Sequence, residues 1–255
     1  MIIPKTIHYC WFGRKLLPYS ARKCIASWRN YFPNWNIVEW NEENYNVRKI
    51  PYITEAYEQK KYAFVSDYAR FDILYQYGGI YFDTDVEVIR SFDDILNNGM
   101  FMGFEIDGGS NSSSNDLNST IQNRMINPGL GLGVAPGIGL IKKILDYYQY
   151  QHFVNSEGNI NTETVVTKVT RILIEEGLKN VSGIQNISGI YIYPKEYFNP
   201  LNNNTGKLEI TENTHSIHWY SMSWMSKIQK IRSMITRPIH RIFGENILHK
   251  IRKHD

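Results

Sequence analysis

The sequence has 255 residues, of which 42% are hydrophobic, so it is long and apolar enough for a normally packed globular core. Its net charge is only +3, but residues 227–255 hold eight of the 28 Lys and Arg residues and two of the 25 Asp and Glu residues. This tail therefore carries +6 and the first 226 residues carry −3. The slightly negative charge of the first 226 residues argues against a nucleic-acid-binding domain, which usually spreads positive charge over one face. The basic tail is more typical of contact with an anionic membrane.

Cysteine usage and the N-terminal segment favour a cytoplasmic location. Cys10 and Cys24 stand outside any zinc-type spacing, and we expect two reduced, buried thiols. Lys5 and His8 interrupt the first apolar stretch, and no small-residue cleavage site follows, so no secretory signal is predicted. Nowhere does the sequence contain an uninterrupted run of about 18 apolar residues, the length that spans a bilayer.

The predicted fold opens with a strand, a helix and a second strand. Thr6 to Phe12 reads as a buried strand that ends at Gly13. Tyr19 to Phe32 has apolar residues at helical spacing, and Asn36 to Trp40 is a second short apolar run. A βαβ unit at this spacing predicts an α/β fold with a parallel sheet.

The later elements continue this alternation. Further helices are expected at residues 51–60, 63–77, 93–96, 138–153 and 162–176. Further strands are expected at residues 80–89, 100–105, 130–135, 190–193 and 216–219. Gly78-Gly79 should end the second of these helices. Gly108 to Thr120 has too few apolar residues to pack, which indicates a surface loop.

The strongest chemical signal is Asp83-Thr84-Asp85, which interrupts the strand expected at residues 80–89. Two carboxylates at i and i+2 can share a hard divalent cation, and Mg²⁺ and Mn²⁺ prefer such oxygen ligands. A solvated turn can produce the same triplet by chance. Here the apolar neighbours Tyr81-Phe82 and Val86 to Ile89 should hold it close to the sheet, which favours the ligand interpretation.

Four other positions have both a functional and an ordinary structural interpretation. Asp67 and Arg70 lie three residues apart on one helix, so they either form an intrahelical ion pair or face a common cleft, where Arg70 could bind a phosphate or sugar oxygen. Trp11 could be a core tryptophan or a platform for a nucleobase. His218 could be a partly buried structural histidine or lie beside a carboxylate-bound metal.

These residues lie in four segments that occur in the order of a known family: IPKTIHYCWFG at 3–13, FVSDYARFDILYQYGGIYFDTDVEV at 64–88, YPKEYFNP at 193–200 and IHWYSMSW at 217–224. The sequence resembles the DXD sugar transferases of glycosyltransferase family 32, especially bacterial members that synthesise capsular and exo-polysaccharides. The clostridial glucosylating toxins are more distantly similar. One departure is Trp219, which stands where many relatives carry a second His or a smaller residue.

The resemblance implies a GT-A fold with a central, mostly parallel mixed sheet in residues 1–226, a UDP-sugar donor, Mn²⁺ or Mg²⁺, and retention of anomeric configuration. It also implies roles for matching positions. Catalysis would rest on Asp83, Asp85 and Arg70, and the metal ligands would be Asp85, Asp83 and His218. The donor would be bound by Trp11, Asp67, Arg70, Tyr81, Asp83, Ser223 and Trp224.

We therefore predict that the protein transfers a sugar to a hydroxyl of a saccharide during bacterial surface polysaccharide synthesis. We expect this acceptor saccharide to be linked to a lipid. One alternative is a glucosyltransferase that modifies a protein. Another is a non-catalytic carbohydrate- or metal-binding module, which would explain the DXD triplet but not Asp67, Arg70 and the His-Ser-Trp segment together. Nucleic acid is not an expected partner.

The basic tail at 227–255 has its own pattern. Its isoleucines recur at spacings of three and four, which predicts a helix with one apolar stripe: Ile228, Ile231, Ile235, Ile239 and Ile242. The stripe could pack on the domain or dip into an anionic membrane, which would make the protein peripheral on the inner face of the membrane.

Overall fold

A computed structural model of the chain describes residues 2–108 and 124–220. The predictions for Ser223, Trp224 and the tail at 227–255 lie outside these residues, as does nearly all of the loop predicted at 108–120. In the described ranges, no helix is both long enough and apolar enough to cross a membrane.

The first βαβ unit forms as predicted. Strand β1 (Thr6–Cys10) leads into α1 (Tyr19–Tyr31), and β2 (Asn36–Trp40) returns parallel to β1 in the register Ile7↔Ile37. Both cysteines are free and buried, as expected.

The middle of the chain supplies the strands at the centre of the sheet. Helices α2 (Pro51–Glu58) and α3 (Tyr62–Tyr77) precede β3 (Gly79–Tyr81), which lies parallel to β1. Strand β4 (Val86–Val88), α4 (Asp93–Asn98), β5 (Met100–Asp107), β6 (Arg124–Ile126) and β7 (Leu132–Val134) follow. Gly78 and Gly79 have φ values of 62° and 103°, which side chains rarely tolerate, so glycine is required where α3 turns into β3.

The last part of the chain contributes helices and the far edge of the sheet. Helices α6 (Gly139–Gln149) and α7 (Val165–Glu175) precede β8 (Gln185–Ile187) and β9 (Ile190–Tyr193). A short helix α8 (Lys195–Phe198) and β10 (Ser216–His218) end the described chain.

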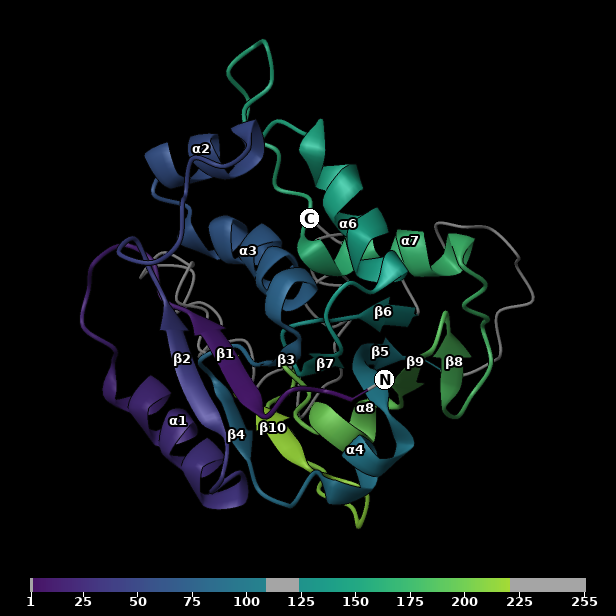
Figure 1. Ribbon diagram of the computed structural model, residues 1–255. Helices are drawn as coiled ribbons and strands as arrows, with labels where there is room; N and C mark the ends of the chain where they lie inside the picture. Colours follow the sequence, from purple (N-terminus) through teal and green to yellow (C-terminus); the bar gives the residue numbers. More distant parts are fainter. Residues whose placement is uncertain (1, 109–123, 221–255) are drawn as a thin grey trace, which may run out of the picture.

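These strands form a central mixed sheet in the order β2-β1-β3-β7-β5-β9-β8, with β6 paired to β5. Strands β2, β1, β3, β5 and β9 point one way, whereas β7, β8 and β6 are antiparallel to their neighbours. Figure 1 shows α2, α3, α6 and α7 on one side of this sheet and α1, α4 and α8 on the other. A second, two-stranded sheet of β4 and β10 lies on the α1 side (Figure 1). The predicted α/β fold with a mostly parallel mixed sheet is confirmed.

Several predicted helices were too long, and two of them show the cause. The helix expected at 138–153 ends at Gln149, because the backbone N–H groups of Phe153 and Val154 instead donate to Glu55 at 2.7 and 2.9 Å. The helix expected from residue 162 begins at Val165, because the Thr164 side chain caps it by accepting from the backbone of Thr167. The short β6, β8 and α8 were missed.

An aromatic cluster joins α1 to the strand that follows the DXD triplet. Trp28 is fully buried, its ring lies 5.5 Å from that of Phe82, and its indole N–H donates to the carbonyl of Val86 at 2.8 Å. The helix therefore holds both the residue before Asp83 and the residue after Asp85. Rigid support on both sides of a turn limits where its side chains can point.

Trp28→Phe should lower the free energy of unfolding by about 1–3 kcal/mol, because the buried carbonyl of Val86 loses a donor that no other group replaces at low cost. Urea unfolding followed by circular dichroism measures this. Trp35→Phe is the control, since Trp35 is half-buried and packs its ring on Phe32 at 5.1 Å, and it should cost less. Equal losses in the two variants would remove the hydrogen bond as the cause.

Candidate active site

The DXD triplet occupies a tight connection between β3 and β4. The backbone N–H of Asp83 donates to Gly129 at 2.9 Å, and the N–H of Val86 donates back to the carbonyl of Asp83 at 3.1 Å. Both carboxylates thus sit on a hydrogen-bonded turn at the carboxyl end of β3, beside the end of its parallel neighbour β1. Ligands of open α/β sheets commonly bind at such an edge.

Strand β10 brings a histidine to the same turn. Its pairing places His218 opposite Val86, and the Nε2 atom of His218 lies 3.1 Å from Oδ1 of Asp85. One ligand atom from each of Asp83, Asp85 and His218 lies within 4.8 Å of the others. Burial alone would lower the pKa of His218, but the Asp85 carboxylate and its hydrogen bond raise the pKa to about 9.

The donor set suits a hard or borderline divalent cation. Two carboxylates and one imidazole converge, and the buried Nδ1 of His218 has no hydrogen-bond partner within the described residues. Oxygen ligands favour Mg²⁺ and Mn²⁺, and a single imidazole is compatible with Mn²⁺. The residues present therefore fit a divalent metal.

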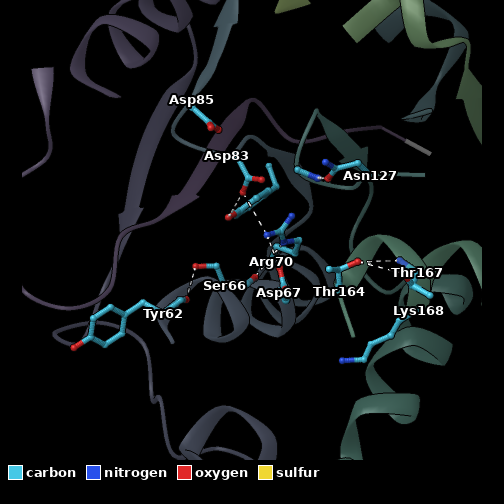
Figure 2. Close-up of polar contacts among 12 residues, drawn as sticks. Tyr62, Ser66, Asp67, Arg70, Asp83, Asp85, Asn127, Thr164, Thr167 and Lys168 are labelled. Carbon is cyan, nitrogen blue, oxygen red and sulfur yellow. Dashed lines mark hydrogen bonds and ion pairs between the residues drawn. The ribbon is translucent and has the colours of Figure 1, made fainter. Parts of the chain in front are cut away.

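Arg70 links the triplet to helix α3 (Figure 2). Its Nη2 atom lies 3.0 Å from Oδ1 of Asp67 and 3.3 Å from Oδ1 of Asp83. The guanidinium also lies over the Tyr81 ring at 4.8 Å, and the Tyr81 hydroxyl donates to Asp83 at 3.1 Å. Burial opposes the charge on Arg70, but Asp83, Tyr81 and Asp67 more than offset it and raise the pKa of Arg70.

The structure thus brings together Asp67, Arg70, Tyr81 and Asp83 in one network. The helix spacing alone left an isolated ion pair and a shared cleft as equal alternatives. The ion pair is present, and it continues from Asp67 through Arg70 to Asp83. The Nη1 atom of Arg70 is buried and has no hydrogen-bond partner among the described residues, which is uncommon for a buried polar atom and is typical of functional sites.

Trp11 stands apart from this network. It follows β1, is half-buried, packs against the core, and its indole N–H donates to the carbonyl of Lys15 at 2.6 Å. Its ring is therefore fixed by the loop that leaves β1. Ser223 and Trp224 lie outside the described residues.

Gly129 is a site residue that sequence reasoning missed. A Cβ atom there would meet Oδ2 of Asp83 at a separation that no real contact allows and would lie 2.9 Å from Nη1 of Arg70. The glycine is therefore needed to leave room for this carboxylate and guanidinium. The only signal in the sequence was the Asn-Pro-Gly turn at 127–129, which does not reveal what packs against it.

A second missed group forms a polar wall next to His218. Asn127 donates to the Glu105 carboxylate at 2.9 Å and accepts from the backbone of Gly129 at 2.7 Å. Tyr220 packs its ring 4.3 Å from that of His218, and its hydroxyl accepts from Asn199 at 2.6 Å. These residues come from strand β5 and from separate connections far apart in the sequence, so no local spacing could group them.

A buried lysine was also missed. Lys168 of α7 is 1% exposed, donates to the Tyr52 hydroxyl at 3.0 Å and lies over the rings of Tyr52 and Tyr148 at 4.5 and 5.1 Å. Burial lowers the pKa of Lys168, and the negative charge of Asp67 offsets only part of this decrease. Burial also raises the pKa of Asp67 to about 6, although the positive charges of Arg70 and Lys168 favour its ionised form.

Asp67→Asn should stabilise the fold at about pH 8 and lose this advantage at about pH 4. The pKa of Asp67 is about 6 in the folded chain, whereas an unfolded Asp has a pKa of about 4. Stability from its protonated form is therefore present below about pH 4 and is lost as the pH rises through 6. The amide never ionises and escapes this loss. The unfolding midpoint in urea at both pH values tests this, and a lower midpoint for the variant at pH 8 would show that the Arg70 pair outweighs burial.

Comparisons with known proteins match the part of the sequence that contains the triplet. A family model described as "Glycosyltransferase sugar-binding region containing DXD motif" matches residues 18–102, which include the triplet. An uncharacterized glycosyltransferase of Acanthamoeba polyphaga mimivirus is 29% identical over 216 residues, 79% of this chain and 77% of the relative. Inositol phosphoceramide mannosyltransferase 3 of Schizosaccharomyces pombe is 31% identical over 101 residues, 37% of this chain and 27% of that protein.

Among solved structures, the PaToxG glycosyltransferase is similar with a TM-score of 0.46 and 17% identity, over 69% of this chain and 70% of the other. Its match is therefore partial in both chains. The DXD triplet at Asp83–Asp85 lies inside the matched family region, and the mimivirus relative extends the similarity over most of the chain. These similarities indicate a glycosyltransferase, and residues 18–102 match the sugar-binding region that contains a DXD motif.

Proposed function

We propose that the protein transfers a sugar from a UDP-sugar to a hydroxyl of a saccharide, with a divalent metal and with retention of anomeric configuration. The observation that carries the proposal is the convergence of Asp83, Asp85 and His218 beside the buried Arg70. A departing nucleoside diphosphate is stabilised by positive charge close to its phosphates. Arg70 and a metal held by the three ligands would supply that charge at this edge of the sheet. Retention follows from the family resemblance and would be read from the anomeric configuration of the product.

Asp85, Asp83 and His218 would hold the metal, which we take to be Mn²⁺ or Mg²⁺. When bound, the cation would neutralise negative charge on the leaving diphosphate. Asp83 is the residue shared by both halves of the site, since it also contacts Arg70 and Tyr81. We therefore assign catalysis to Asp83, Asp85 and Arg70.

The donor would lie across the polar network on α3 and β3. The unpartnered Nη1 of Arg70 would bind a sugar or phosphate oxygen, and the Asp67 carboxylate would accept from donor hydroxyls. Tyr81 would line this pocket and Trp11 would stack on the base. Ser223 and Trp224, which lie outside the described residues, would close over the donor.

We propose a lipid-linked saccharide as the acceptor, in bacterial surface polysaccharide synthesis at the inner face of the membrane. The yeast relative acts, by its name, on inositol phosphoceramide, which gives one precedent for a lipid-bearing acceptor. The catalytic domain would span residues 1–226, and the basic tail at 227–255 would meet anionic lipid. A protein acceptor is the enzymatic alternative, and its test is transfer of radiolabelled sugar to protein or to extracted glycolipid.

Release of UDP from UDP-sugars without acceptor tests the enzymatic proposal as a whole. A panel of UDP-sugars with Mn²⁺ or Mg²⁺, and GDP-mannose as a further donor, also identifies the sugar. A non-catalytic binding module would bind donor or metal and release no nucleotide.

Asp85→Asn should reduce UDP release by about 100- to 1000-fold. The change would weaken binding of the metal, whose positive charge would stabilise the leaving diphosphate, and a preorganised charge of this kind is worth this much in rate. The metal requirement should appear as loss of activity in EDTA and its return on adding Mn²⁺. Circular dichroism checks that the fold is intact. Full UDP release by the wild type in EDTA would eliminate the metal from the proposal.

Gly129→Ala should reduce UDP release by about tenfold or more, since the new methyl would displace the Asp83 carboxylate from its contacts with Arg70 and Tyr81. Gly139→Ala is the matched control, because a Cβ at Gly139 meets nothing within 4 Å. Equal activity in the two variants would show that the position of the Asp83 carboxylate is not critical.

A further inference from the structure

The loop between β1 and α1 presents apolar side chains to solvent. Leu16 is 95% exposed and Tyr19 is 76% exposed. A half-exposed aromatic residue, Trp219 at 40%, follows β10. We call residues 14–23 together with Trp219 the α1 rim. Exposure of large apolar groups costs free energy in water, so a cluster of them indicates a binding surface.

Hydrogen bonds fix this loop in place. The backbone N–H of Gly13 donates to Glu42 at 2.6 Å, and the carbonyl of Lys15 accepts from the Trp11 indole at 2.6 Å. The carbonyl of Pro18 accepts from the backbone of Arg22 at 3.1 Å as α1 begins. Leu16 and Tyr19 therefore project from a braced loop.

The rim is also strongly basic. The first 38 residues contain no Asp or Glu, and the exposed residues Arg14, Lys15, Arg22 and Lys23 all belong to the rim. Of these, Lys23 approaches Glu87 at 3.7 Å. An apolar tip surrounded by cations is the pattern of surfaces that insert shallowly into an anionic bilayer.

The rim continues to the active site. The backbone N–H of Trp219 donates to the carbonyl of Asp85 at 3.0 Å, and its indole N–H donates to Glu87 at 2.8 Å. Because Lys23 also pairs with Glu87, the first turns of α1 and the DXD turn are joined through two side chains. Tryptophan and tyrosine favour the membrane–water interface, where one end of the ring system is wet.

We propose that the α1 rim docks the enzyme on an anionic lipid bilayer, with Leu16 and Tyr19 entering the interface and the basic side chains meeting headgroups. Docking in this orientation would place the turn that carries Asp85 close to the membrane surface. The idea that this orientation helps to deliver a lipid-linked acceptor rests on the proposed function. The proposal that the rim docks on a bilayer does not depend on it.

Charge decides between the possible occupants of the rim. The C-terminal segment at 227–255 carries +6, so it would be repelled by the basic loop. A second copy meeting the same patch about a two-fold axis would oppose like charges. A soluble polyanion would match the charges but would leave Leu16 and Tyr19 in water, whereas a bilayer satisfies both features.

Cosedimentation of the full-length chain with vesicles tests the proposal. Wild type should pellet with phosphatidylcholine–phosphatidylglycerol vesicles and less with phosphatidylcholine alone. The double variant Leu16→Ser/Tyr19→Ser should reduce the partition coefficient by about tenfold or more, since it removes the inserted apolar groups. Arg14→Gln/Lys15→Gln should reduce the partition coefficient by about fivefold for each charge removed, and should make vesicle binding less dependent on salt.

A matched control removes exposed apolar groups elsewhere. Tyr150→Ser/Val181→Ser alters side chains that are 86% and 47% exposed, after α6 and α7 on the opposite side of the sheet (Figure 1), and should bind vesicles like wild type. UDP release without vesicles should be unchanged in all three double variants, which separates this test from failure of the proposed function. Equal vesicle binding by wild type and Leu16→Ser/Tyr19→Ser would overturn the proposal, as would retention on heparin with no vesicle binding.

Discussion

The architecture of the site depends on one buried cation, the guanidinium of Arg70. It lies between carboxylates from different elements, at 3.0 Å from Asp67 on α3 and 3.3 Å from Asp83 after β3. Without it, two negative charges would be held close together in a poorly solvated place, which is strongly unfavourable. Its planar fork, unlike a lysine ammonium, can contact both carboxylates and still direct another N–H toward a ligand.

The same cation explains why the surroundings are so restricted. A guanidinium held at this depth needs an aromatic face, which Tyr81 provides at 4.8 Å, and a gap in the opposite wall, which Gly129 provides by lacking a side chain. Asp67 remains costly to ionise even so, since burial raises its pKa to about 6. The fold thus loses some stability in order to hold these charges together, and such a loss is common at functional sites.

Sequence periodicity was sufficient for the fold class and for most elements, because βαβ spacing and apolar runs are local signals. It left the Asp67–Arg70 pair with two interpretations, but it located the DXD turn, because the triplet lies within one continuous segment of helix, glycine and strand. It failed for the short β6 and β8, which have only three residues each, and for helix ends set by distant partners such as Glu55. Gly129, Lys168 and the Glu105–Asn127 wall were out of reach because their meaning comes only from what packs against them.

His218 shows how strand pairing brings together residues that are far apart in the sequence. It lies 133 positions after Asp85 in the sequence, yet the antiparallel pairing of β10 with β4 sets its ring against that carboxylate at 3.1 Å. Strand β4 is in turn fastened to α1 through Trp28, so the histidine, the carboxylate and the N-terminal helix form one connected support. A displacement of α1 would therefore be transmitted to the turn that carries Asp85. Any partner that binds the exposed side of α1 would therefore act next to the proposed metal-binding residues, without needing a separate pathway through the domain.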